Sequence, residues 1–275
     1  MANKSATLFL VATPIGNLNE VSNRTLDVLR SVSVIACEDT RNSVKLLSHF
    51  DIHTKLITYH NFNEVDSTKG IISLLEKGED VALISDAGYP LISDPGYVLV
   101  NEVIEKGFNI VTVSGPSAGI NALVASGLNT NHYLFYGFLN AKQSAAKKEL
   151  QSLVNFPYTM IFYEAPHRIE KTLKLCLEVF GDRKAVVARE LTKLHEEYLR
   201  GTLNELTKLE DIKGEIVLLI EGCPINEKQE VNEDIMFEEI EALINNGYKT
   251  KQAVKEISIK YDVSKNTLYN SYIKR

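Results

Sequence analysis

The sequence has few cysteines, and their spacing excludes two classes of protein. Only Cys37, Cys176 and Cys223 occur in 275 residues, and each lies far from the other two. Isolated cysteines supply neither a disulfide framework nor the closely spaced ligands of a zinc site. We therefore expect a protein of a reducing compartment that binds no metal.

Long hydrophobic runs are also missing. The first apolar run, Leu8 to Ala12, is too short for the core of a signal peptide and meets Pro14 at once. No run approaches the roughly 20 residues of a membrane-spanning helix. With 44% apolar and 24% charged residues, the composition is that of a globular protein in water. The sequence thus predicts a cytoplasmic protein with no membrane partner.

Two common nucleotide-binding motifs are absent. No Gly-x-Gly-x-x-Gly opens the first predicted strand. The segment Ser114-Gly-Pro-Ser-Ala-Gly119 has the glycines and hydroxyls of a phosphate loop but lacks its Lys-Ser/Thr ending. These absences count against a Rossmann dinucleotide enzyme and against an ordinary nucleotide hydrolase.

The net charge of −6 hides a basic C-terminal segment. Residues 246–275 contain seven Lys/Arg and two acidic residues, a charge of +5 that leaves −11 on the rest of the chain. A basic tail on an acidic body favours a polyanionic partner for the tail. A merely solvated basic helix gives the same count, so charge alone leaves both interpretations open.

Short runs rich in β-branched residues alternate with segments of helical period, which predicts α/β architecture with a mostly parallel sheet covered on both faces. A second series of strands and helices follows, and two α/β domains fit better than one large sheet. We expect domains at 1–120 and 121–224, then a linker and helical tail at 225–275. The first series has strands at 7–13, 33–37, 55–58, 81–85 and 109–113, with helices at 22–31, 40–49, 65–77, 95–106 and 117–126. The second has strands at 133–137, 158–163, 184–189 and 215–221, with helices at 142–154, 166–180 and 202–209.

The tail is predicted to be all-helical, with helices at 235–246, 250–260 and 264–273. The last two resemble a helix-turn-helix motif, with Ser264 capping the second helix and Lys265 near its start. A small helical dimerisation or capping module explains the same pattern.

The most informative segment contains the pattern Ser-Asp-x-Gly twice, as Ser85-Asp-Ala-Gly88 and Ser93-Asp-Pro-Gly96. It directly follows a strand that is predicted to be buried. Glycines let a ligand come close, and the aspartates supply fixed hydrogen-bond acceptors. We expect Asp94 to be a helix N-cap with Pro95 at the first helical position, so the second half is mainly structural. Two ordinary turns are the simpler alternative.

One kind of junction recurs where strands end and helices are predicted to begin. It occurs at Thr13-Pro14, Asp94-Pro95, Gly115-Pro116 and Ala165-Pro166. Ligands of open parallel sheets bind outside the carboxyl ends of the strands, where these junctions fall. The sequence therefore predicts a single site lined from both α/β domains.

Charged residues follow several predicted strands. Glu38, Asp39 and Arg41 could bind a ligand or supply a general base, or could form an ion pair that caps the helix at 40–49. In the second domain, Glu164, His167 and Arg168 could position a phosphorylated substrate or move a proton. Further along, Arg189, Lys193 and His195 could meet RNA phosphates or pair with neighbouring glutamates.

Six segments together resemble the ribosomal RNA small subunit methyltransferase I family of the tetrapyrrole methylase-like superfamily. The match runs in order from about residue 7 to 222, and the helical tail resembles the family's extension. The doubled Ser-Asp motif and the Glu-Ala-Pro-His-Arg motif are the specific ones. The segments are Ala12-Thr-Pro-Ile-Gly-Asn-Leu18, Ala36-Cys-Glu-Asp-Thr-Arg41, Ser85-Asp-Ala-Gly-Tyr-Pro-Leu-Ile-Ser-Asp-Pro-Gly96, Ser114-Gly-Pro-Ser-Ala118, Phe162-Tyr-Glu-Ala-Pro-His-Arg168 and Arg189-Glu-Leu-Thr-Lys193.

The resemblance implies methyl transfer from S-adenosylmethionine to the ribose 2′-hydroxyl of a cytidine in the decoding region of 16S ribosomal RNA. It also implies two α/β domains with the cofactor between them and a homodimer that acts on the small ribosomal subunit. By similarity, the cofactor contacts map to Pro14, Asp86, Gly88, Ser117, Ala118, Tyr163, Gly214 and Glu215.

A ribose hydroxyl is a weak nucleophile, so a nearby base would help, and we hypothesise that Glu38 or Asp39 fills this role. RNA contacts are expected from Arg41, His167, Arg168, Arg189 and Lys265. Two rivals remain: a methylase of the same fold acting on a tetrapyrrole or diphthine-type substrate, and a non-catalytic ribosome-associated RNA-binding factor.

Overall fold

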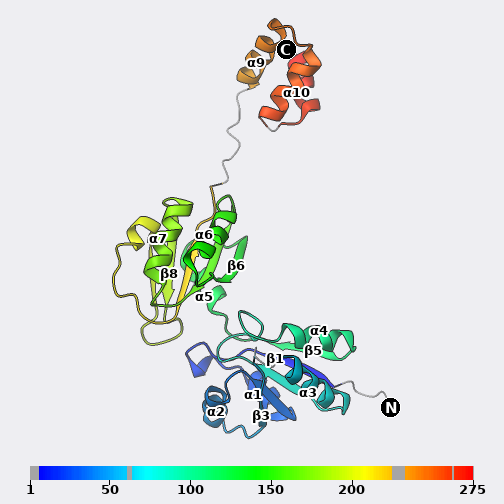
Figure 1. The fold of residues 1–275 in the computed structure, drawn as a ribbon, viewed down its shortest axis with the longest axis vertical. Helices are drawn as coiled ribbons and strands as arrows, with labels where there is room; N and C mark the ends of the chain where they lie inside the picture. Colours follow the sequence, from blue (N-terminus) through cyan, green and yellow to red (C-terminus); the bar gives the residue numbers. More distant parts are fainter. Residues whose placement is uncertain (1–5, 61–63, 225–232, 262, 275) are drawn as a thin grey trace. The chain divides into compact units, whose positions relative to one another are not determined.

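The computed structural model describes residues 6–60, 64–224, 233–261 and 263–274 (Figure 1). The chain forms two compact units, residues 1–223 and 224–275, which are described separately. Most of the predicted linker at 225–232 lies outside the described residues. No helix among the described residues is long and apolar enough to cross a membrane.

The first unit begins with a fully parallel five-stranded sheet in the order β3-β2-β4-β1-β5. The central strands β2 and β4 are buried at every position, as their continuous apolar runs require in a sheet covered on both faces. The strands are β1 (Thr7–Val11), β2 (Val34–Cys37), β3 (Lys55–Thr58), β4 (Val81–Ile84) and β5 (Asn109–Val113).

Helices cover both faces of this sheet. Helices α1 (Asn23–Ser31) and α2 (Thr40–His49) pack on one face, and α3 (Glu64–Glu76) and α4 (Tyr97–Glu105) pack on the other. The chain therefore leaves β1 toward one face and β4 toward the opposite face. Because β1 and β4 are neighbours, their carboxyl ends form the switch point where open α/β sheets bind ligands.

The second sheet of this unit has the order β6-β7-β10-β8-β9 and is mostly antiparallel. Only β6 and β7 run parallel; the other neighbours are antiparallel. Its strands are β6 (Tyr133–Phe138), β7 (Thr159–Glu164), β8 (Lys184–Arg189), β9 (Glu197–Thr202) and β10 (Ile216–Ile220). Strand β9 was not predicted, because its polar sequence reads as a charged loop. It pairs with β8 through a short connection, which only antiparallel strands permit.

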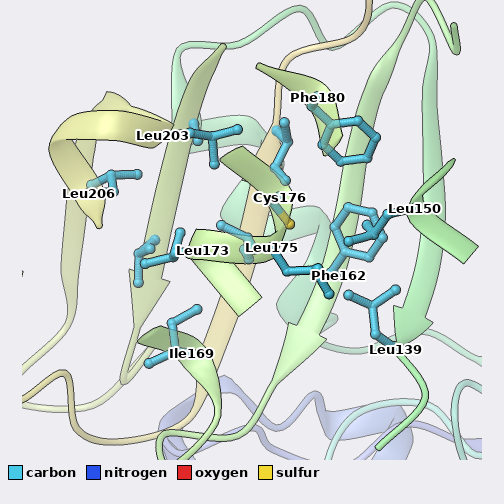
Figure 2. Close-up of a cluster of buried hydrophobic side chains, with 14 of the residues drawn as sticks. Leu139, Leu150, Phe162, Ile169, Leu173, Leu175, Cys176, Phe180, Leu203 and Leu206 are labelled. Atoms are coloured by element: carbon cyan, nitrogen blue, oxygen red, sulfur yellow. The ribbon is translucent and has the colours of Figure 1, made fainter. Parts of the chain in front are cut away.

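The two faces of the second sheet are covered differently. Helices α6 (Gln143–Ser152), α7 (Ile169–Phe180) and α8 (Leu203–Leu206) pack on one face, in the cluster of Figure 2. Helix α5 (Ala118–Ser126) packs on the other face. The α/β fold with two sheets is thus confirmed. The expected boundary at residue 120 falls inside α5, and the exact division of this unit stays a prediction.

The predicted helix starts at prolines are wrong in detail. Helices α4, α5 and α7 begin at Tyr97, Ala118 and Ile169, two or three residues after Pro95, Pro116 and Pro166. Only a short 3-10 helix, η1 (Leu18–Glu20), follows Pro14.

Asp94 does not cap α4, because the N-cap is Gly96. The side chain of Glu64 on α3 accepts from the amides of Gly96 at 3.1 Å and Val98 at 3.4 Å. A neighbouring helix therefore provides the acceptor that we expected from Asp94.

The second unit consists of α9 (Glu233–Asn245), α10 (Thr250–Lys260) and α11 (Lys265–Lys274). These helices share a core of their own, built from Phe237, Ile240, Val254, Ile257 and Leu268. The Ser264 hydroxyl accepts from the Thr267 amide at 3.4 Å, so Ser264 caps α11 as predicted.

Candidate functional site

The site is organised by a bridge between the loops that follow β1 and β4. The Thr13 amide donates to the Gly88 carbonyl at 2.9 Å, and the Gly88 amide donates to the Thr13 carbonyl at 3.0 Å. The Thr13 hydroxyl also donates to the carbonyl of Ser85 at 3.1 Å. Gly88 has a φ of +75°, a conformation that glycine adopts without steric cost. The first half of the doubled motif is therefore fixed to the end of β1.

A cavity of about 400 Å3 opens beside this bridge and is lined from both sheets. Five of the predicted cofactor residues line it: Gly88, Ser117, Ala118, Tyr163 and Glu215. The remaining lining side chains are mostly apolar, including Ile15, Ile92, Phe138 and Leu191. The predicted convergence of strand ends on one site is therefore seen, although the cofactor roles of these residues stay predictions.

Two aromatic side chains form part of the wall. Phe138 and Tyr163 are register partners on β6 and β7, with ring centroids 5.5 Å apart. Burial raises the pKa of the Tyr163 phenol, opposed by a hydrogen bond with the Gly119 backbone and assisted by the charge of Asp94. Tyr163 is therefore a neutral hydroxyl at neutral pH, suited to hydrogen bonding.

The Ser114-Gly-Pro-Ser segment packs against the end of β1. The Gly115 amide donates to the Tyr89 hydroxyl at 3.1 Å. A Cβ at Gly115 would lie 2.8 Å from the Cβ of Ala12, so a side chain cannot fit there without movement. Glycine at 115 thus permits the close approach that brings Ser117 and Ala118 to the cavity.

Pro14 and Asp86 do not line the larger cavity, and Gly214 lines neither this cavity nor the one that holds Pro14 and Asp86. Pro14 and Asp86 line a smaller cavity of about 250 Å3, together with Gly16, Leu18, Asn42, Lys45 and Leu46. The Asn42 side-chain amide donates to the Asp86 carboxylate at 2.9 Å. Asp86 is thus held toward α2, beside the positive charge of Lys45.

The Asp39 side chain is engaged locally. Its carboxylate accepts from the Arg41 amide at 2.8 Å, caps α2, and pairs with the Arg41 guanidinium at 2.7 Å. These hydrogen bonds with Arg41 lower the pKa of Asp39 to about 2. Such a carboxylate is a weak base, and neither Asp39 nor Glu38 lines the larger cavity. The helix-capping alternative therefore describes Asp39 well.

Asp94 lines the larger cavity, and its pKa is shifted in the opposite direction from that of Asp39. Burial raises its pKa from 3.8 to about 6, and the charges of Glu38 and Asp86 add to the effect, while a hydrogen bond with Ser85 opposes it. From the sequence we expected Asp94 to have a structural role, and its position on the cavity wall was missed.

The Glu-Ala-Pro-His-Arg motif is largely structural. The buried Glu164 carboxylate accepts from the Thr172 hydroxyl at 2.5 Å and pairs with Arg168 at 3.2 Å. Arg168 also donates to the carbonyl of Leu139 at 3.0 Å. This network fixes the end of β7 while Pro166 reaches the cavity wall. His167 is exposed.

The loop between β8 and β9 is held by ion pairs. Arg189 pairs with Glu197 at 2.6 Å, and Lys193 pairs with Glu190 at 3.0 Å and with Glu215 at 3.2 Å. Gly214 approaches Glu190 so closely that a Cβ would collide with its side chain. The pairing alternative therefore describes Arg189 and Lys193, whereas the side chain of His195 is exposed. Lys265 is exposed on α11 of the second unit.

The missed wall residues could partly have been found from the sequence. Phe138 directly follows the predicted strand at 133–137, and the rule that ligands meet strand ends applies to it as much as to Tyr163. Ile15, Ile92 and Leu191 are apolar residues in loops, and a single sequence does not distinguish them from core residues.

Comparison with known proteins gives two kinds of match. A sequence model of the family Tetrapyrrole (Corrin/Porphyrin) Methylases matches residues 7–207. A protein of Bacillus subtilis (strain 168) named Ribosomal RNA small subunit methyltransferase I is 41% identical over 275 residues, covering 96% of this chain and 93% of the relative. A protein of the same name from Streptococcus pyogenes serotype M18 is 43% identical over 272 residues, covering 98% and 95%.

Solved structures agree on the fold. A diphthine synthase has a TM-score of 0.63 at 14% identity, covering 79% of this chain and 90% of that protein. The uroporphyrin-III-C-methyltransferase of Thermus thermophilus has a TM-score of 0.56 at 18% identity, covering 78% and 94%.

Proposed function

Because the chain belongs to the tetrapyrrole methylase family, with near full-length relatives named Ribosomal RNA small subunit methyltransferase I, we propose that it methylates RNA of the small ribosomal subunit. The proposed reaction transfers a methyl group from S-adenosylmethionine to the ribose 2′-hydroxyl of a cytidine in the decoding region of 16S RNA. The observation that supports it most directly is the cavity beside the Thr13–Gly88 bridge.

The larger cavity suits such a methyl donor in size and chemistry. Its volume of about 400 Å3 falls within the roughly 300–1,000 Å3 of small-molecule sites. Ile15 and Leu191 offer apolar surface for a purine ring. The carboxyl group of Glu215 complements the cationic groups of the donor.

When bound, the donor supplies an activated methyl group on a sulfonium, so the chain has to align the acceptor and exclude water. Gly88, Ser117 and Ala118 would hold the donor, since their small side chains let it approach the backbone. Phe138 and Tyr163 would exclude water from the opposite wall.

The RNA would approach along α2 and the smaller cavity. The exposed guanidinium of Arg41 and the ammonium of Lys45 lie one turn apart on this helix, and Lys45 lines the cavity. Cations in this position favour contact with RNA phosphates. His167, Arg168, Arg189 and Lys265 remain proposed RNA contacts. Arg168 and Arg189 are the weaker ones because their paired side chains are only 25% and 27% exposed, whereas that of Arg41, also paired, is 86% exposed.

We also propose that the protein is a homodimer and acts in the cytoplasm, where ribosomal subunits are. Exposed apolar side chains on α4 and α5, such as Tyr97, Ile104 and Val124, support a second copy as a partner. Light scattering of the purified protein tests the dimer.

Two measurements test the proposed function. Calorimetry should detect S-adenosylmethionine binding, and the protein should methylate purified small subunits at a ribose that mapping then identifies. Absence of cofactor binding would favour the non-catalytic RNA-binding factor. Cofactor binding without methylation of subunits, combined with methylation of a tetrapyrrole or a diphthine-type precursor, would favour the other rival.

A further inference from the structure

The loop before α4 holds a strained conformation on the cavity wall. Leu91 and Ser93 have φ angles of +71° and +67°, which non-glycine residues rarely adopt. Between and after them, Ile92 and Asp94 line the larger cavity. Strained backbone of this kind costs about 1–3 kcal/mol per residue and clusters at functional sites. The loop is thus a candidate for a functional role in addition to starting α4.

Asp94 is free to serve the cavity because Glu64 replaces it at the helix terminus. The Glu64 carboxylate accepts from the Gly96 amide and from the Tyr59 hydroxyl, the latter at 3.0 Å. An aspartate in the sequence Asp-Pro-Gly before a helix would ordinarily cap it. Here the cap is provided by α3, so the Asp94 carboxylate is not consumed by the backbone of α4.

The surroundings of Asp94 make its carboxylate a better base than an ordinary one. The like charges of Glu38 after β2 and Asp86 after β4 raise the pKa of Asp94. The charge of Asp94 in turn raises the pKa of Tyr163 on β7 of the second sheet. Burial and the charges of Glu38 and Asp86 bring the pKa of Asp94 to about 6, whereas that of Asp39 is about 2. A base is most effective when its pKa lies near the working pH.

We infer that Asp94 accepts the proton of the ribose hydroxyl during methyl transfer, with Glu38 as a positioning residue that acts through Asp94. The inference rests on the proposed function. The hydroxyl oxygen bonds to the methyl carbon as the bond from that carbon to sulfur breaks. The electron pair of the broken bond stays on sulfur, and the hydroxyl proton passes to a carboxylate oxygen of Asp94.

The first test is Asp94→Asn, measured by single turnover on small subunits that lack the modification. The rate at saturating cofactor should fall by about 100-fold or more, as for loss of a general base. Calorimetric affinity for S-adenosylmethionine should stay within about threefold, less than 1 kcal/mol. The matched control is Asp66→Asn, an exposed aspartate on α3 that pairs with Lys69, which should leave rate and affinity unchanged.

The second test follows protonation directly, without turnover. Carboxyl-13C NMR of the unliganded protein should show one aspartate titrating near pH 6, absent from Asp94→Asn and shifted to lower pH in Glu38→Gln. The pH at which the single-turnover rate rises should move down in Glu38→Gln as well. Asp94→Glu, which keeps a carboxylate on the loop, should recover part of the rate that Asp94→Asn loses.

Three results would overturn the inference. One is an undiminished rate in Asp94→Asn, and another is a loss of rate that saturating cofactor restores, which would mean that Asp94 only holds the donor. The third is an Asp94 signal that titrates near pH 4 and whose titration pH does not change in Glu38→Gln. The proposed function fails separately, because then the unaltered protein itself would not methylate small subunits.

Discussion

Thr13 and Gly88 exchange two backbone hydrogen bonds, which join two loops that each contribute residues to both cavities. Ile15 and Gly88 face the larger cavity, whereas Pro14 and Asp86 face the smaller one. In the loop after β1, successive residues point to opposite sides, because Pro14 and Gly16 line the smaller cavity and Ile15 lines the larger one, as in an extended strand.

Gly88→Ala should weaken cofactor binding by about tenfold or more, because the methyl group enters the larger cavity. The fold should survive, since the nearest atoms to the new Cβ would be 3.6 Å and 3.7 Å away. Gly78→Ala is the matched control, with a similar φ of +82° and no atom within 4 Å. Calorimetry should show normal affinity in the control, and equal losses in both variants would contradict the prediction.

Asp39→Ala should lower the thermal unfolding midpoint, while Asp39→Asn should leave it nearly unchanged. Asparagine caps a helix about as well as aspartate, and alanine does not. Both variants should retain methyl transfer, because Asp39 is engaged by α2 and Arg41. If Asp39→Asn lost turnover with normal cofactor affinity, Asp39 would be restored as the candidate base.

Asp94→Asn should stabilise the protein without cofactor at pH 7 by about 1–2 kcal/mol, allowing for solvent screening. The pKa of Asp94 is raised from 3.8 to about 6, so its contribution to stability is complete below pH 4 and is lost as pH rises through 6. Urea unfolding at pH 4 and pH 7 measures the difference between variant and parent. A difference that does not change with pH would show that Asp94 titrates normally.

Gly115→Ala should destabilise the protein by about 1–3 kcal/mol, because its Cβ would press on Ala12 at 2.8 Å. Gly70→Ala in α3 is the contrasting substitution, since no atom lies within 4 Å of its Cβ. It should stabilise the protein by about 0.5–1 kcal/mol through helix propensity. Equilibrium unfolding of the two variants should therefore shift in opposite directions.

Deleting residues 226–275 should leave cofactor affinity intact and reduce turnover on small subunits. The removed segment belongs to a unit with its own core, so the two-sheet unit should remain folded. Charge reversal at adjacent exposed positions of α10 refines the test: Lys255→Glu should reduce turnover, most strongly at low salt, and Glu256→Lys should not. Unchanged turnover in the deletion would refute a docking role.

The sequence predicted the strands of the first sheet well, because β2 and β4 are buried on both sides and read as apolar runs. It missed β9, whose Glu197 and Arg200 carry charge on a half-exposed strand. The family resemblance pointed to Gly88, Ser117 and Tyr163, which all line the larger cavity at or shortly after the ends of strands. The sequence-based prediction misjudged Asp94, since the replacement of its capping role by Glu64 depends on how α3 packs against α4.

Ile15 belongs to the loop after β1, yet its side chain is 7% exposed and packs in the core of the second sheet with Leu191 and Val217. Separating the two sheets would move this isoleucine into water, at a cost of about 2 kcal/mol or more. The same residue lines the larger cavity. The two sheets should therefore unfold in one cooperative thermal transition. A ligand that contacts Ile15 should change the stability of both sheets.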